Sequence, residues 1–255
     1  MAQKKKRLDI RIKELGLAQN RSKAQALIMS GAVEVNGTLV TKAGFFVGED
    51  DNITLRQKGC PYVSRGGLKL EAAIKYFNIT IKDKICLDVG ASTGGFTDCL
   101  LKHGAKLIYA LDVGYGQLDW SLRNRKEIIN MEKVNIRHVT KDMFPEAPQL
   151  ATIDTSFISL KLVVPNVLNV MKDECEIVAL IKPQFEAGRE KVGKGGIIKD
   201  KEIHKEVVDN LTSFFKEELA LKVIGTIESP ILGAKGNREF LTYLKRDLGG
   251  RDVRP

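Results

Sequence analysis

The 255-residue sequence has few of the residues that build metal centres or disulfide frameworks. It contains three histidines and four cysteines, and the cysteines stand far apart with no CxxC pair: Cys60, Cys86, Cys99 and Cys175. Zinc sites need closely spaced Cys and His ligands, and disulfide-stapled domains need many cysteines in a short chain. The sequence therefore predicts four free thiols, no metal site and a reducing, cytoplasmic setting.

Long apolar stretches are also absent. No segment approaches the roughly 20 apolar residues that a membrane-spanning helix needs. The basic start MAQKKKRLD is not followed by the apolar segment of a secretory signal. Aromatic residues make up only 6% of the chain, and no basic helix rich in Trp and Phe is visible. We therefore expect no membrane as a partner.

Acidic residues are fewer than basic ones, 32 against 41, which gives a formal net charge of +9. The excess is concentrated at the N-terminus, where residues 1–65 hold twelve Lys and Arg against six Asp and Glu. Basic runs are usually solvated surface, but a strong asymmetry between the two parts of a chain favours a polyanionic partner. We interpret the N-terminal part as a module that faces nucleic acid.

Residues 1–59 have the pattern of a small α+β domain. Apolar residues at helical spacing predict a helix over residues 7–16. A capping-box pattern of Ser22 with Gln25 predicts the start of a second helix. Alternating runs at 32–40 and 52–57 predict short strands, the first with a hairpin turn at Asn36-Gly37.

This N-terminal stretch resembles the S4-like RNA-binding domain. The resemblance covers residues 7–55 and is carried by a basic helix pair followed by SGAVEVNG, residues 30–37. It implies phosphate-positioning contacts to RNA, which give salt-dependent affinity with little sequence choice. The candidate RNA-binding residues are Lys6, Arg7, Arg11, Arg21, Lys23, Lys42 and Arg65.

After a predicted linker at residues 60–65, the pattern changes to alternating helices and strands. A helix is predicted over residues 64–79 and a long amphipathic helix over residues 201–219. The predicted strands are 84–90, 107–114, 150–157, 176–183, 222–229 and 239–246. Such alternation predicts an α/β, doubly wound (Rossmann-like) domain over residues 66–248, with a mostly parallel sheet, an antiparallel last strand and a flexible tail at 249–255.

The turn LDVGASTGGFTDCLL, residues 87–101, joins an apolar strand to a helix through small residues. Glycines at such a turn let a ligand approach the backbone, although a tight packing turn without ligand has the same appearance. The GxGxxG pattern of dinucleotide sites lacks its second glycine here. The candidate ligand-binding residues of the turn are Gly90, Ala91, Ser92, Thr93, Gly94 and Gly95.

Three acids stand near predicted strand ends and favour S-adenosylmethionine over a dinucleotide. Asp88 is assigned to the methionine amino group, Asp112 to the ribose diol and Asp142 to the adenine amine. A pyrophosphate beside Asp88 would be repelled, and no Walker lysine follows the glycines to bind ATP. We therefore expect S-adenosylmethionine as the cofactor.

Four further charged residues stand at or near the same predicted edge: Lys69, Asp154, Lys182 and Glu239. A structural Asp–Lys ion pair is the alternative for either member alone. Together, the four suit methyl transfer to a ribose 2′-hydroxyl, which needs a base and in-line alignment. We assign Lys182 as the base, Asp154 to orienting donor and acceptor, and Lys69 with Glu239 to tuning and clamping.

Six motifs resemble the TlyA family, also called hemolysin A, of FtsJ-like rRNA methyltransferases. They are YVSRGGLKLEAA, LDVGASTGGFTDCLL, DVGYGQLDWSLR, DTSFISL, IKPQFEAGRE and GNREFL. The resemblance places the family's Lys–Asp–Lys–Glu tetrad on the four residues above. It also places the methyl-donor pocket on the Gly90–Gly95 loop, Asp112, Ser156 and Phe157.

The resemblance implies 2′-O-methylation of cytidine in ribosomal RNA within ribosomal subunits. Two other functions remain alternatives: a hemolysin-like membrane-active protein, and a non-catalytic RNA-binding factor for ribosome assembly. The sequence leaves open which nucleotide is modified and in which subunit. A monomer is the expectation for the oligomeric state.

Overall fold

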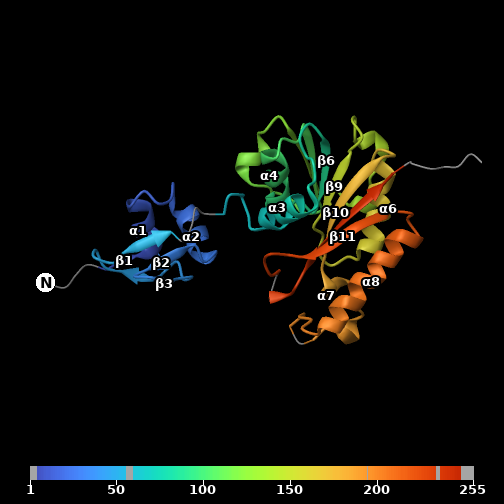
Figure 1. The fold of residues 1–255 in the computed structure, drawn as a ribbon. Helices are drawn as coiled ribbons and strands as arrows, with labels where there is room; N and C mark the ends of the chain where they lie inside the picture. The colour runs from blue at the N-terminus through green and yellow to red at the C-terminus, as the bar shows by residue number, and fades with distance from the viewer. Residues whose placement is uncertain (1–4, 56–59, 194, 234–235, 248–255) are drawn as a thin grey trace, which may run out of the picture. The chain divides into compact units, whose positions relative to one another are not determined.

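The computed structural model describes residues 5–55, 60–193, 195–233 and 236–247. The chain divides into two compact units, residues 1–61 and 62–255 (Figure 1). The first four residues and the predicted tail at 249–255 lie outside the described residues.

The predicted linker at 60–65 belongs in part to the second unit. The ring of Tyr62 is buried and lies against Gly67, where an added Cβ would meet it. The Val63 amide donates a hydrogen bond to Asp98 at 2.9 Å. Residues 62–65 therefore pack as the start of the second unit.

The first unit is a small α+β domain with two helices. The helices are α1 (Leu8–Glu14) and α2 (Arg21–Met29), and the strands are β1 (Lys6–Arg7), β2 (Val33–Val35), β3 (Thr38–Leu39), β4 (Phe46–Val47) and β5 (Ile53–Leu55). The predicted hairpin turn lies between β2 and β3, with φ of 53° at Asn36 and 76° at Gly37. The predicted cap of the second helix is wrong: Asn20, not Ser22, accepts the Lys23 amide at 2.8 Å. Ser22 therefore lies inside the first turn.

A buried carboxylate joins the two helices of the first unit. Asp9 is fully buried in α1 and accepts hydrogen bonds from Arg7 at 3.1 Å, Arg21 at 2.9 Å and Gln25 at 2.8 Å. The Arg7 hydrogen bond is the main cause that holds the pKa of Asp9 well below its usual range. A buried charge is tolerated only when it is paired in this way. Two of the predicted RNA contacts, Arg7 and Arg21, thus also hold the unit together.

Replacing Asp9 with Ala is expected to destabilise the first unit by on the order of 2 kcal/mol, because several charge-assisted hydrogen bonds are lost. Amides of α1 and α2 should exchange hydrogen faster, while amides of the second unit keep their protection. The wild-type pKa is lowered, so the stabilisation is present above the ordinary carboxyl value of 3.8 and is lost as the pH falls below it. Glu49→Ala on the exposed surface is the control, and unchanged exchange in Asp9→Ala would contradict the structural role.

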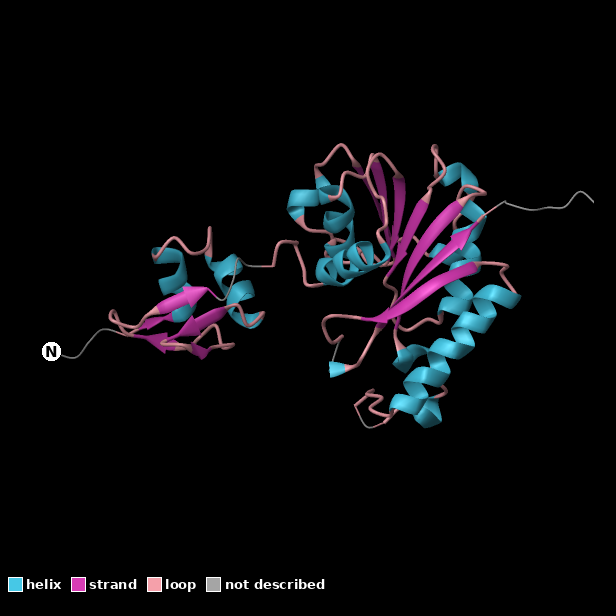
Figure 2. Cartoon of the chain, in the orientation of Figure 1, coloured by secondary structure: helices cyan, strands magenta, loops and turns pink. Residues whose placement is uncertain are grey.

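The second unit is a seven-stranded sheet with helices on both faces (Figures 1 and 2). In spatial order the strands are β11 (Lys222–Glu228), β12 (Phe240–Arg246), β10 (Cys175–Ile181), β9 (Leu150–Ile153), β6 (Ile85–Val89), β7 (Leu107–Asp112) and β8 (Ile128–Glu132). Strands β6 to β10 run parallel, and β12 is antiparallel to both β10 and β11. The predicted doubly wound sheet with an antiparallel last strand is confirmed.

The helices cover the central strands, whose residues are mainly apolar. The α-helices are α3 (Gly66–Phe77), α4 (Gly95–Lys102), α5 (Trp120–Arg123), α6 (Leu160–Val170), α7 (Pro183–Glu186) and α8 (Lys201–Glu217). Helices α3 and α4 lie on one face and α6 and α8 on the other (Figure 1). Every residue of β6 and β9 is buried, as expected for parallel strands covered on both faces. Across the described residues, no helix is both long and apolar enough to cross a bilayer.

The strand directions bring distant segments to one edge of the sheet. Parallel strands all end at the same edge, so the residues after β6, β7, β9 and β10 meet there. Because β12 is antiparallel to β10, it begins where β10 ends, with Phe240 opposite Ile181. Lys182, which follows β10, and Glu239, which precedes β12, are therefore neighbours across the pair.

Candidate active site

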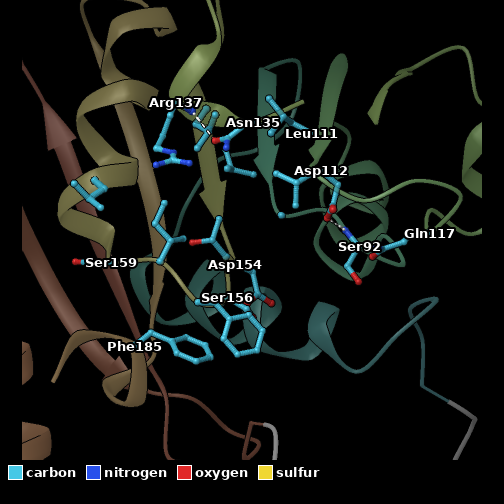
Figure 3. A pocket seen from close by; sticks show the side chains of 18 residues that line it. Ser92, Leu111, Asp112, Gln117, Asn135, Arg137, Asp154, Ser156, Ser159 and Phe185 are labelled. Carbon is cyan, nitrogen blue, oxygen red and sulfur yellow. Dashed lines mark hydrogen bonds between the residues drawn. The ribbon is translucent and has the colours of Figure 1, made fainter. Parts of the chain in front are cut away.

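A cavity of about 770 Å³ opens at this carboxyl edge (Figure 3). It is lined by the segments that follow β6, β7, β8 and β9, together with Phe185 of α7. Four of the predicted site residues in this lining carry polar side chains: Ser92, Asp112, Asp154 and Ser156. The volume falls within the range of small-molecule sites.

Gly90 is required by the backbone that lies beside it. Its φ is +85°, and an added Cβ would lie 2.5 Å from the carbonyl oxygen of Asp154. The turn after β6 can therefore approach the segment after β9 only with glycine at this position. Gly90 and Ser92 both line the cavity, in agreement with their predicted role.

The other two glycines of the turn serve packing within the protein. An added Cβ at Gly94 would clash with Leu122, and one at Gly95 would clash with Ser64 and approach the Gly67 amide to 2.9 Å. The approach at Gly95 lets α4 pack directly against the start of α3, and that at Gly94 brings the turn against α5. Four residues of the predicted loop do not line the cavity: Ala91, Thr93, Gly94 and Gly95. For Gly94 and Gly95 the structure shows a packing role, and the ligand contacts of all four stay predictions.

Asp112 holds the turn in place from the end of β7. One carboxylate oxygen accepts the Ser92 amide at 2.8 Å (Figure 3). The other accepts the Gly114 amide at 2.7 Å. Ser92 has a φ of +48°, which is unusual for a residue with a side chain. The carboxylate therefore fixes a strained turn and faces the cavity with capacity for further donors.

Asp88 does not reach the cavity, which corrects its predicted role. The side chain is fully buried in β6 and accepts hydrogen bonds from Thr97 at 2.6 Å and Thr152 at 2.9 Å. Burial raises the pKa of Asp88 to about 7, although both hydroxyls oppose the shift. Asp88 therefore connects β6, α4 and β9 beneath the site, and its side chain is not part of the cavity lining.

Replacing Asp88 with Asn is expected to flatten the dependence of stability on pH. The folded-state pKa is raised, so the contribution of Asp88 to stability is fully present below the ordinary value of 3.8 and is lost as the pH rises towards about 7. The loss amounts to at most about 1.4 kcal/mol per pH unit. Urea unfolding at pH 5 and pH 8 measures it, with the exposed Asp173→Asn as control. An equal decline in Asp88→Asn would show that another group is responsible.

Asp142 is also misplaced by the sequence prediction. The sequence pattern suggested a strand-like segment ending at Asp142, whereas the third strand, β8, ends at Glu132 and is followed by short 3₁₀ turns. Asp142 is exposed in the second of these turns and does not line the cavity. Asn135 and Arg137 occupy the position after β8 instead (Figure 3). The weak alternation of β8 hid them from the sequence analysis.

Lys182 and Asp154 form an ion pair at the cavity. Lys182 follows β10, is 8% exposed, and its Nζ lies 2.6 Å from Asp154 Oδ1 after β9. The same Nζ donates a hydrogen bond to Ser156 Oγ at 2.9 Å. Asp154 and Ser156 both line the cavity (Figure 3). A buried ammonium thus sits directly behind the cavity wall.

Lys69 and Glu239 form a second buried pair. Lys69 in α3 is 9% exposed, Glu239 is 2% exposed, and the ion pair measures 2.5 Å. Glu239 lies next to Lys182 in the β10–β12 register described above. The four predicted catalytic residues therefore form two ion pairs, and Lys182 and Glu239 stand at the paired ends of β10 and β12. Of the four, Asp154 lines the cavity, and the catalytic roles of all four stay predictions.

Phe157 is an exposed aromatic residue in a strained conformation. It is 88% exposed, has a φ of +64° and lines the cavity. Its ring lies 4.8 Å from that of Phe185, between centroids. A phenylalanine held in this way is unusual, and such strain is common at ligand sites.

Within the described residues, no group of three or more His, Cys, Asp or Glu side chains could hold a metal ion. The four cysteines are free thiols, three of them buried.

Residues 62–246, well over half of the chain, match the FtsJ-like methyltransferase family. The chain belongs to this family.

Relatives of this FtsJ-like methyltransferase carry two kinds of name. It is 38% identical to the Mycobacterium tuberculosis protein named 16S/23S rRNA (cytidine-2′-O)-methyltransferase TlyA, over 94% of this chain and 89% of the relative. It is 45% identical to the Brachyspira hyodysenteriae protein named hemolysin A, over 93% and 98%. A solved structure of a hemolysin-type protein from Streptococcus thermophilus is 42% identical, covers 96% and 90%, and has a TM-score of 0.75. The predicted resemblance to the TlyA family is confirmed.

The N-terminal unit of the methyltransferase matches the S4 domain over residues 6–53. Several of its candidate RNA-binding side chains already have partners inside the unit. Lys6 and Arg11 pair with Glu14 at 3.0 and 3.5 Å, and Lys23 donates to Gln19 at 3.0 Å. Lys42 and Arg65 are exposed.

Proposed function

We propose that this protein transfers the methyl group of S-adenosylmethionine to the ribose 2′-hydroxyl of cytidine in ribosomal RNA, acting on ribosomal subunits in the cytoplasm. The observation that carries the proposal is the buried Lys182–Asp154 pair at the cavity. The names of the relatives support cytidine and ribosomal RNA as the target.

The cavity fits the proposed cofactor. Both oxygens of Asp112 retain acceptor capacity beside their backbone donors, which suits a ribose diol. Asn135 and Arg137 offer polar groups for the adenine end, a role the sequence analysis gave to Asp142. When bound, the cofactor supplies a methyl group on a positively charged sulfur.

Lys182 is the proposed base. As the neutral amine, its Nζ would take the proton of the 2′-hydroxyl when that oxygen receives the methyl group. Asp154 and Ser156 hold Nζ in place, and the Lys69–Glu239 pair fixes the neighbouring strand. Positioning supplies much of the rate in such a displacement.

The test combines cofactor binding with methyl transfer. Calorimetry should detect S-adenosylmethionine binding, and radiolabelled methyl should enter ribosomal subunits. Mapping of 2′-O-methyl positions in rRNA from cells with and without the gene then identifies the cytidines. Binding without transfer to any subunit would favour the assembly factor, and lysis of vesicles without cofactor binding would favour the membrane-active protein.

A further inference from the structure

The segments that follow β9 and β10 are connected at three successive points. At the first, Lys182 contacts Asp154 and Ser156. At the second, Phe185 packs against Phe157. The third connection is made by Glu186 at the end of α7, a residue to which the sequence analysis assigned no role.

Both carboxylate oxygens of Glu186 bind the start of α6. Oε2 accepts the Ser159 hydroxyl at 2.6 Å, and Oε1 accepts the Leu160 amide at 2.8 Å. Ser159 is the N-cap of α6 and in turn accepts the Lys161 amide at 3.1 Å. A carboxylate is stabilised at a helix N-terminus, where backbone N–H groups lack partners. Glu186 thus fixes the end of the segment whose start is fixed by Lys182.

The residues between these two connections form part of the cavity wall, so their position affects the site. Ser156, Phe157 and Ser159 all line the cavity, and Phe157 has a left-handed backbone. Strain of this kind persists only where the surroundings over-determine the conformation. Burial raises the pKa of Glu186, and the hydrogen bonds from Ser159 and Leu160 oppose that shift. Burial of a charged carboxylate costs free energy, and the hydrogen bonds from Ser159 and Leu160 offset part of that cost.

We propose that Glu186 is a positioning residue for methyl transfer, which holds the segment 154–160 against the segment 182–186 so that Lys182 and the cavity wall keep their reactive alignment. This proposal rests on the proposed function, because its main test measures the rate of methyl transfer. It goes beyond the Lys–Asp–Lys–Glu residues, because Glu186 acts through Ser159 and Leu160 and does not itself line the cavity.

Two variants of Glu186 test the proposal. Glu186→Ala removes both hydrogen bonds, and kcat for methyl transfer should fall about 10- to 100-fold, since misplacement of about 1 Å has effects of this size. The dissociation constant for RNA and the KM for subunits should change less than about threefold. Glu186→Gln should stay within about threefold of wild type, because its oxygen can accept the Leu160 amide and its nitrogen can donate to Ser159. Glu174→Ala, an exposed carboxylate at the opposite end of β10, is the control.

Hydrogen exchange provides a readout independent of catalysis. In Glu186→Ala, the amides of 156–161 should lose protection while those of β6 and β7 do not. Unchanged kcat in Glu186→Ala, or a Gln variant as slow as the Ala variant, would overturn the proposal. A wild type that transfers no methyl would overturn the proposed function instead, and the exchange data would still decide whether Glu186 fixes the segment.

Discussion

Replacing Lys182 with Ala is expected to reduce methyl transfer to ribosomal subunits by about 10²- to 10⁴-fold, the usual contribution of a general base. The variant loses the only Nζ that contacts both Asp154 and Ser156 among the described residues. Binding of S-adenosylmethionine should change much less, because Lys182 itself does not line the cavity. Single-turnover transfer of radiolabelled methyl, with calorimetry on the same sample, measures both effects.

Lys216→Ala on the exposed side of α8 removes the same charge far from the cavity and is the control. Full turnover in Lys182→Ala would show that the base assignment is wrong. Loss of cofactor binding together with turnover would show that Lys182 supports the pocket and not the proton transfer. Lys182→Arg adds a further test, because a guanidinium keeps the charge but cannot act as a base at neutral pH.

The second large effect is on the stability of the protein when the Lys69–Glu239 ion pair is broken. Replacing Glu239 with Ala leaves the Lys69 ammonium buried without its carboxylate, and the free energy of unfolding should fall by about 3–5 kcal/mol. Replacing both residues, Lys69→Met with Glu239→Leu, removes the uncompensated charge and should restore most of that loss. Methyl transfer should remain low in both variants, because the pair also supports the segment beside Lys182.

Urea unfolding and methyl transfer on the same three proteins distinguish the two roles. If the double variant is as stable as the wild type but inactive, the ion pair is needed for catalysis and not for stability. If the double variant is both stable and fully active, the pair has no part in the reaction. Glu228→Ala, at the exposed end of β11, is the control for a lost carboxylate near the same strands.

The sequence predicts what depends on local pattern and strand direction. Apolar runs predicted β6, β7, β9 and β10, and charged residues directly after two of them predicted Asp154 and Lys182 at one edge. Asp88 and Asp112 share the pattern LDVG, yet Asp88 is buried inside β6 opposite Ala110, and Asp112 ends β7 and faces the cavity. Which way a side chain turns at a strand end depends on neighbours such as Thr97, which no local pattern identifies.

Contacts between residues of different helices and strands could not be predicted from the local sequence pattern. Gly94 has a φ of +95°, and Gly95 is approached by the Gly67 amide and by Ser64, so one glycine is required by the turn and the other by a tertiary neighbour. Glu186 is similar, because its partners lie 26 and 27 residues away on another helix. A capping residue supplied by a different element has no signature of fixed spacing.

The antiparallel last strand has a consequence for the making of the protein. Lys69 and Glu239 are 170 residues apart, and the strand after Glu239 is the final described element to leave the ribosome during synthesis. A nascent chain that stops before Glu239 lacks β12, so β10 is an unpaired edge strand and Lys69 has lost its carboxylate partner. Incomplete translation products are therefore expected to be catalytically dead even when their first unit has already folded.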